Sequence, residues 1–209
     1  MIISSNFSTT QKRIELKDVF RIRDRLLLEQ AIILSKFSFR RIFSDRIVNS
    51  VYYDTFNYNS LEESLEGESI RKKSRVRWYG PNDDESEATL EIKLKQGHLS
   101  WKKLYHDSFT ICPKAKKWNL FLQSNYEADF PRYYLKNLLP RSIVTYKRSY
   151  YSSFDNKIRI TIDQDLKTFN QHSLFDRNLE YKRKHENVLI LEIKVDNCNE
   201  TMLKKVLED

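Results

Sequence analysis

The stretch RKKSRVRWYG, residues 71–80, sorts its charged and apolar side chains by position. Five of its first seven residues are cationic, a content that would also suit a solvated basic loop. However, Arg75 and Arg77 share one parity while Val76 lies between them, and in a β-strand alternating residues point to opposite faces. The pattern favours a strand with one charged face and one apolar face.

The same alternation recurs along the whole chain. It is found in RIELK at 13–17, TLEIKLK at 89–95, SWKKLYHDSFT at 100–110, VTYKRSYY at 144–151, KIRITID at 157–163 and LILEIKV at 189–195. The polar faces comprise Arg13, Glu15, Lys17, Glu91, Lys93, Lys95, Lys102, His106, Ser108, Thr110, Tyr146, Arg148, Tyr150, Lys157, Arg159, Thr161, Asp163, Glu192 and Lys194. Each of these segments is therefore predicted to be a strand with two unlike faces.

Helical periodicity and capping residues predict four helices. The first begins at Asp18, as its N-cap, and runs to about Ser35. Two shorter helices are expected at 115–123 and 132–138, and Asn199 is expected to cap a last one. Strands dominate, so we expect an α+β fold built around a largely antiparallel sheet.

The chain shows no repeat and no linker rich in Pro or Gly, so a single domain over residues 1–209 is expected. Two arrangements of the charged strand faces remain open. An antiparallel sheet can leave its charged face in water, or the sheet can close into a barrel with that face inward. Rows of like charge on neighbouring strands are unfavourable unless an anion neutralises them, but the pattern alone does not decide.

The composition favours anionic partners and excludes several kinds of site. Lys plus Arg is 37 and Asp plus Glu is 29, and the net charge of +8 suits nucleic acid, phosphorylated molecules or an acidic membrane face. The three glycines are too widely spaced for a glycine-rich phosphate loop, so side chains would have to hold any phosphate. Two cysteines allow no disulfide framework, which suits the cytoplasm, and no apolar run is long enough for a membrane span.

Seven short motifs, in order along the chain, resemble those of the VTC domain, the polyphosphate-polymerase branch of the triphosphate tunnel metalloenzyme (CYTH-like) superfamily. They are RIELK at 13–17, SVYYDT at 50–55, RVRWYG at 75–80, EIKLK at 91–95, YKRSYY at 146–151, IRITID at 158–163 and LEIKV at 191–195. The resemblance covers about residues 11–208. It implies a closed antiparallel β-barrel, or tunnel, with a charged lumen and with helices packed on the outside.

The resemblance also implies which residues form the site. The cationic positions that would act on the phosphates are Lys17, Arg75, Arg77, Lys93, Arg148, Arg159 and Lys194, with Lys102 and Tyr146 as further phosphate-binding residues. The ligands of a divalent metal ion, Mn²⁺ or Mg²⁺, would be Glu192 first and then Glu15 and Glu91, because such ions prefer hard oxygen donors. These glutamates could instead only pair with neighbouring lysines inside the barrel.

Three functions agree with these residues. The leading one is a metal-dependent polyphosphate polymerase that transfers the γ-phosphoryl group of ATP to a growing chain, with ATP, triphosphate or polyphosphate as its partners. The second is a triphosphatase of the same tunnel fold. The third is a protein that binds polyphosphate or nucleic acid without turnover. The leading interpretation involves no nucleic acid, no obligate protein partner and no membrane span.

Overall fold

The computed structural model describes residues 7–81, 85–125, 130–172, 175–196 and 200–208. Its strands are β1 Phe7–Thr9, β2 Arg13–Arg21, β3 Arg40–Asp54, β4 Ile70–Tyr79, β5 Ser86–Gln96, β6 Leu99–Ile111, β7 Leu122–Ser124, β8 Leu139–Ser152, β9 Ile158–Asn170, β10 Lys182–Lys184 and β11 Val188–Asp196. The helices are α1 Arg25–Leu34, α2 Asn59–Leu65, α3 Trp118–Phe121, α4 Phe130–Leu135 and α5 Glu200–Leu207. The mostly antiparallel sheet with few helices is therefore confirmed.

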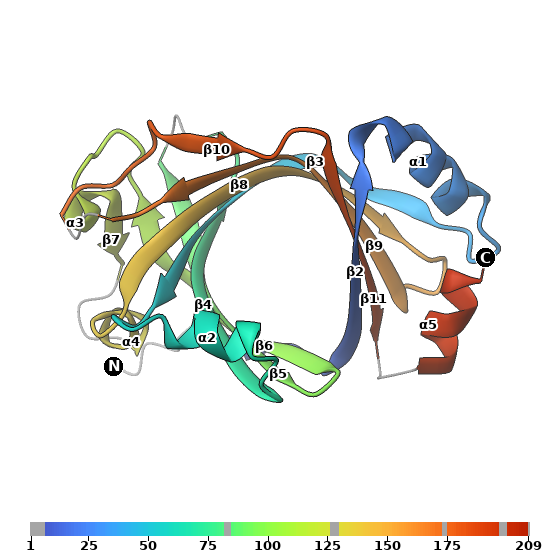
Figure 1. The fold of residues 1–209 in the computed structure, drawn as a ribbon, viewed down its shortest axis with the longest axis horizontal. Coiled ribbons are helices and arrows are strands. Elements are labelled where there is room, and N and C mark those ends of the chain that lie inside the picture. The colour runs from blue at the N-terminus through green and yellow to red at the C-terminus, as the bar shows by residue number, and fades with distance from the viewer. Residues whose placement is uncertain (1–6, 82–84, 126–129, 173–174, 197–199, 209) are drawn as a thin grey trace.

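The long strands pair in a circuit. The order is β6, β2, β11, β9, β8, β3, β4 and β5, and β5 pairs in turn with β6. Figure 1 shows the strands curving around an interior, with α1 and α5 outside one part of the ring and α3 outside another. We call the face of the sheet toward this interior the inner face.

The extent of strand pairing differs between neighbours in the circuit. Strand β5 pairs with β6 from Ser86↔Ile111 to Gln96↔Leu99, whereas β2 pairs with β6 only at Arg13↔Ser100 and Ile14↔Leu99. The predicted closed barrel therefore depends on a short seam between β2 and β6.

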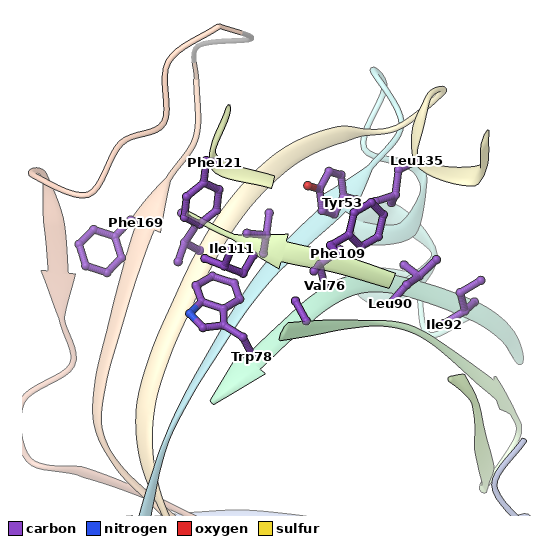
Figure 2. Packing of buried hydrophobic residues seen from close by; sticks show 13 residues of the cluster. Tyr53, Val76, Trp78, Leu90, Ile92, Phe109, Ile111, Phe121, Leu135 and Phe169 are labelled. Atoms are coloured by element: carbon purple, nitrogen blue, oxygen red, sulfur yellow. The ribbon is translucent and has the colours of Figure 1, made fainter. Parts of the chain in front are cut away.

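The outer face of the sheet is apolar and packs in two clusters. Figure 2 shows the first, in which Val76 and Trp78 of β4 lie buried and the Trp78 ring meets Phe121 of α3 edge to face at 5.7 Å. The second cluster joins α1 and α5 to β9 and β11, and includes Ile32 and Leu203. The apolar strand faces predicted from the alternation are thus confirmed as packing faces.

The first helix begins later than its predicted cap at Asp18. Strand β2 continues past Asp18 to Arg21, since Asp18 pairs with Leu191 and the pairing with β11 extends to Arg21↔Val188. The Asp18 carboxylate accepts a hydrogen bond from the next backbone N–H instead of capping a helix. Asp24, just before α1, accepts from the backbone N–H of Arg21. A long partner strand outweighed the local capping signal.

The other predicted helices are present but shorter or shifted. The helix expected at 115–123 is reduced to α3, because residues 122–124 pair with β6 as strand β7. The helix expected at 132–138 is α4, which begins and ends earlier. The predicted cap Asn199 lies outside the described residues. Within the described ranges, none of the helices has the length and apolarity that a membrane crossing requires.

Candidate functional site

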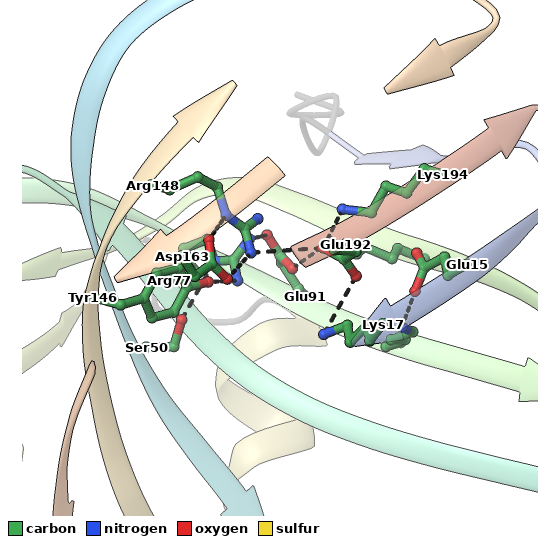
Figure 3. Close-up of polar contacts among 12 residues, drawn as sticks. Glu15, Lys17, Ser50, Arg77, Glu91, Tyr146, Arg148, Asp163, Glu192 and Lys194 are labelled. Carbon is green, nitrogen blue, oxygen red and sulfur yellow. Dashed lines mark hydrogen bonds and ion pairs between the residues drawn. The ribbon is translucent and has the colours of Figure 1, made fainter. Parts of the chain in front are cut away.

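Glu91 of β5 is the centre of one group of charges on the inner face (Figure 3). Arg75, directly across on β4, donates to Glu91 Oε2 from Nε at 2.9 Å and from Nη2 at 2.6 Å. Arg77 Nη1 lies 3.5 Å from Oε1, and Lys102 Nζ of β6 donates to Oε2 at 3.0 Å. The structure thus brings Arg75, Arg77, Lys102 and Glu91 together.

Glu192 of β11 is the centre of a second group (Figure 3). Lys194 Nζ, on the same strand, donates to Glu192 Oε2 at 2.7 Å. Lys17, directly across on β2, lies 3.3 Å from Oε1, and Arg148 Nη2 lies 3.6 Å from Oε2. The contact from Arg148 comes from β8, so this group spans strands that are far apart in the sequence.

Glu15 lies beside the second group. It pairs with Arg13 Nε at 3.0 Å and with the ammonium group of Lys93, which reaches over from β5. In the register of β2 and β11, Glu15 is opposite Lys194. Arg159 of β9 lies on the other side of Lys194, directly opposite it.

Asp163 of β9 is a partner that the sequence placed on the polar parity but not in the site. Arg148 Nε donates to Asp163 Oδ1 at 2.5 Å, and Nη2 donates to Oδ2 at 2.6 Å. This two-point geometry fixes the guanidinium plane. The register Arg148↔Asp163 creates the pair, and a register cannot be derived from one strand alone.

Hydroxyl groups orient the arginines of the first group. The Tyr52 hydroxyl accepts from Arg75 Nη1 at 2.9 Å, and the Tyr146 hydroxyl accepts from Arg77 Nη2 at 3.1 Å. Ser50 Oγ accepts from Arg77 Nε at 3.3 Å. The predicted residue Tyr146 therefore acts on the site through an arginine, while Tyr52 and Ser50 were not predicted.

The buried carboxylates stay ionised because cations surround them. Burial alone would raise the pKa of Glu91, but Arg75 and Arg77 hold that pKa well below its usual value. Burial would also raise the pKa of Glu15, yet Lys93 lowers it to about 2. For Glu192, the effect of Lys194 and its neighbours outweighs burial and lowers the pKa.

For the buried lysines, in contrast, burial outweighs the neighbouring carboxylates and favours the neutral form. Burial lowers the pKa of Lys194 to about 8, although Glu192 acts against the change. Burial, followed by the charge of Arg75, lowers the pKa of Lys102 well below its usual value. The carboxylates present thus do not fully compensate the cations of the inner face.

Like charges also lie directly opposite one another on neighbouring strands of the inner face. These pairs are Arg71 with Lys95, Lys73 with Lys93, Lys93 with Lys102, and Arg159 with Lys194. Such pairs destabilise a sheet unless something neutralises them. Burial lowers the pKa of Lys73 in the same way as that of Lys194. The arrangement suits an extended polyanion.

The described carboxylates of the inner face would need further ligands, such as substrate oxygens, to hold a metal ion. Among the described residues, no group of three or more His, Cys, Asp or Glu side chains could hold a metal by itself. Glu15 and Glu192 lie on adjacent strands and influence each other's ionisation, whereas Glu91 is held by Arg75 on β5. Thr161 Oγ1, opposite Glu192, is buried and has no hydrogen-bond partner in the described part of the chain.

Comparisons with known proteins bear on the family and on the fold. A family model described as the VTC domain matches residues 12–209. Among solved structures, a "putative adenylate cyclase" from Vibrio parahaemolyticus has a TM-score of 0.50 at 12% identity, covering 95% of this chain and 84% of its own. No curated protein matches the sequence.

Two further structures are similar at lower scores. A "putative adenylyl cyclase" from Hippeastrum, described as having a dominant triphosphatase activity, has a TM-score of 0.48 at 13% identity. A protein from Pyrococcus horikoshii OT3 has a TM-score of 0.46 at 14% identity. Each covers 94% of this chain and 84% of its own.

Proposed function

The chain belongs to the VTC domain family, and from this premise we propose that it is a metal-dependent polyphosphate polymerase. In the proposed reaction, a terminal phosphate oxygen of the chain attacks the γ-phosphorus of ATP. The bond from that phosphorus to the β,γ-bridging oxygen breaks, and ADP leaves. The product is a chain longer by one phosphate.

The observation that carries the proposal is the row of like-charged pairs on the inner face. Lys73, Lys93 and Lys102 succeed one another across β4, β5 and β6. A surface binding one small anion needs only a few cations, whereas a row that crosses several strands matches a ligand with repeated charges. Polyphosphate is such a ligand, and its charge would remove the repulsion between the lysines.

We propose that the circuit of strands encloses this ligand as a tunnel. The apolar outer face, packed against α1, α3 and α5, supports an interior that holds the charges. An enclosed site excludes water, which strengthens the contacts between guanidinium groups and phosphate oxygens. Exclusion of water also favours transfer to a phosphate acceptor over hydrolysis.

Phosphoryl transfer requires alignment and charge stabilisation more than covalent help from the protein. In the proposal, Arg75, Arg77 and Arg148 grip the reacting phosphates, because a guanidinium group can donate two parallel hydrogen bonds to phosphate oxygens. Their planes are already set by Tyr52, Tyr146 and Asp163 before substrate arrives. The remaining predicted cations, Lys17, Lys93, Lys102, Arg159 and Lys194, would hold the rest of the ATP and the chain.

The donor set fits a Mn²⁺ or Mg²⁺ ion that is shared with the phosphates. Such an ion is commonly held by one or two carboxylates together with substrate oxygens and water. Glu192 would be its principal ligand and Glu15 the next, with the Thr161 hydroxyl, which has no hydrogen-bond partner among the described residues, opposite Glu192. When bound, the ion would neutralise charge on the phosphate oxygens.

The test is to incubate the purified protein with ATP and Mn²⁺ or Mg²⁺ and to separate the products on a gel. The proposal expects long polyphosphate chains that disappear in an Arg75→Ala variant. Free phosphate without chains would favour the triphosphatase, in which water is the acceptor. Triphosphate binding without either product would favour a binding protein.

A further inference from the structure

Helix α1 turns Ile32 and Leu28 toward the second apolar cluster, together with the polar residues Arg25 and Glu29, and leaves most of its other apolar residues exposed. Glu29 Oε1 accepts a hydrogen bond from the Tyr151 hydroxyl of β8 at 3.0 Å and another from Arg25 Nη2 at 3.0 Å. Arg25 in turn donates to the side chain of Gln164 on β9. These contacts fix the rotation of the helix about its own axis.

The outward side of α1 is mainly apolar, and Gln30 is its exposed polar residue. The exposed fractions are 65% for Leu26, 66% for Leu27, 61% for Ile33 and 82% for Leu34. A surface helix of a monomeric protein normally turns such residues toward the core, and only Ile32 of this helix is fully buried. A contiguous exposed apolar surface of this kind typically marks a binding surface.

Cations flank this apolar surface. The exposed Arg21 and Arg23 precede α1, and the exposed Lys36 follows it. Helix α5 packs on the same cluster of β9 and β11 and exposes Lys204 and Lys205. Figure 1 shows α1 and α5 on the same outer side of the ring.

Acidic residues are fewer on these segments. They are Asp24, which lies 3.8 Å from Arg23 Nε, Glu29, which is turned inward to Tyr151 and Arg25, Glu200 at the start of α5, and Glu208 beyond its end. The exposed cations just named outnumber them. The face formed by α1 and the flanking cations is therefore apolar along its middle and basic around it.

We propose that α1 is a docking surface for an anionic lipid bilayer. The apolar side chains of α1 would enter the interfacial region of the bilayer, while Arg21, Arg23 and Lys36 would contact the headgroups. A second copy of the chain fits less well, because two-fold contact through this face would bring the same cations together. The inference is independent of the proposed function, since α1 lies outside the ring of strands.

The test is flotation of the full chain with vesicles of equimolar phosphatidylglycerol and phosphatidylcholine, and with vesicles of phosphatidylcholine alone. The variant combines Leu27→Glu and Leu34→Glu. The matched control combines Leu61→Glu and Leu65→Glu on α2, where both leucines are also exposed. Both variants lose two leucines and gain two negative charges, so general attraction of a basic protein to anionic lipid changes equally.

We expect the parent and the α2 control to float with the anionic vesicles. The α1 variant should bind at least about tenfold more weakly, because buried apolar groups contribute strongly to interfacial binding. Binding by the parent should weaken markedly on phosphatidylcholine alone. Thermal melting of both variants checks that they are folded.

Three outcomes would overturn the proposal. The parent fails to float with anionic vesicles, the two variants bind equally, or binding is the same on both lipid compositions. Sedimentation velocity examines the second copy directly. A parent that is dimeric and an α1 variant that is monomeric, with no vesicle binding by either, would identify the surface as a contact between copies instead.

Discussion

Glu91 and Glu192 are both buried carboxylates in contact with three cations, yet the two environments differ in how firmly the cations are held. At Glu91, Arg75 forms two hydrogen bonds to one oxygen, and Arg77 and Lys102 are also nearly enclosed. Guanidinium groups held in this way are shielded from water, so water could not solvate them if they lost this contact. Moving any of them away from Glu91 would leave a charge unpaired in a buried place.

At Glu192, Lys194 is also enclosed and donates at 2.7 Å, but the other two partners are held less firmly than Arg75 is at Glu91. The Lys17 side chain is 55% exposed. The guanidinium group of Arg148 already donates to Asp163 and lies 3.6 Å from the Glu192 carboxylate. Thr161, opposite Glu192, keeps a free hydroxyl among the described residues. The comparison teaches that equal numbers of cations do not make equal sites. Glu91 suits a permanent ion pair, whereas Glu192 can exchange partners for a ligand.

The largest expected effect is a loss of folding stability in the Glu91→Gln variant. This change leaves Arg75, Arg77 and Lys102 buried without their carboxylate, at a cost of roughly 3–5 kcal/mol in the free energy of unfolding. Denaturant titration in a buffer free of phosphate measures it. Triphosphate should restore more stability to this variant than to the parent, because it supplies the missing negative charge.

Glu192→Gln serves as the control for that experiment, since it removes the same charge at the looser site. If both variants lose equal stability, the difference between the two carboxylates is not real. A Glu91→Gln protein as stable as the parent would contradict the permanent ion pair outright.

The second prediction concerns turnover in Glu192→Gln. If Glu192 is the principal metal ligand, turnover with Mn²⁺ should fall about a hundredfold or more, the scale of several kcal/mol of lost charge stabilisation. ATP binding measured without metal should be unchanged or tighter, since one repulsive charge has gone. A variant that melts much earlier but keeps its metal-dependent activity per folded molecule would show that Glu192 only balances charge.

The third prediction concerns Arg75→Ala. Loss of its charged hydrogen bonds should weaken triphosphate binding by about 1.5–3 kcal/mol. Folding should survive, because Arg77 and Lys102 still neutralise Glu91. Calorimetric titration compares this variant with Arg23→Ala, which removes an exposed arginine outside the ring. Equal affinities in the two variants would remove Arg75 from the site.

The sequence predicted which residues face inward but not which residues meet. Alternation is local, so Arg75 and Arg77 could be separated from Val76 and Trp78 without knowledge of any neighbour. The pairing of Arg148 with Asp163 depends on register and on a bulge between Thr145 and Lys147, neither of which a single strand encodes.

The same limit explains the other differences. Tyr52 and Ser50 reach the site because β3 pairs with β4, and the alternation within each strand does not encode that pairing. The predicted start of α1 at Asp18 was wrong because Asp18 pairs with Leu191, on a strand far away in the sequence. Helical periodicity predicted a helix in this region, but it did not predict that Leu27 and Leu34 would face solvent.

The smallest predicted effect is a pH dependence at Lys194. Burial lowers the pKa of Lys194 to about 8 in the folded protein, from an ordinary value of 10.5. Below pH 8 the ammonium group is charged and can hold phosphate. As pH rises through 8, the group loses its proton, and a phosphate ligand must then bind together with a proton. Triphosphate affinity should therefore stay level up to about pH 8 and fall about tenfold by pH 9 to 10.

The effect of Lys194 on the free energy of unfolding has the opposite sign to its effect on triphosphate affinity. Between about pH 8 and 10.5 the unfolded chain keeps the proton that folded Lys194 has lost, so the contribution of this residue to stability rises with pH in that window. Lys194→Arg separates the two effects, because a guanidinium group stays charged throughout. Its triphosphate affinity should fall less across the range than that of the parent, because Lys102 is then the remaining one of these two lysines with a lowered pKa. A parent protein whose affinity falls no more than that of Lys194→Arg would show that Lys194 keeps its proton.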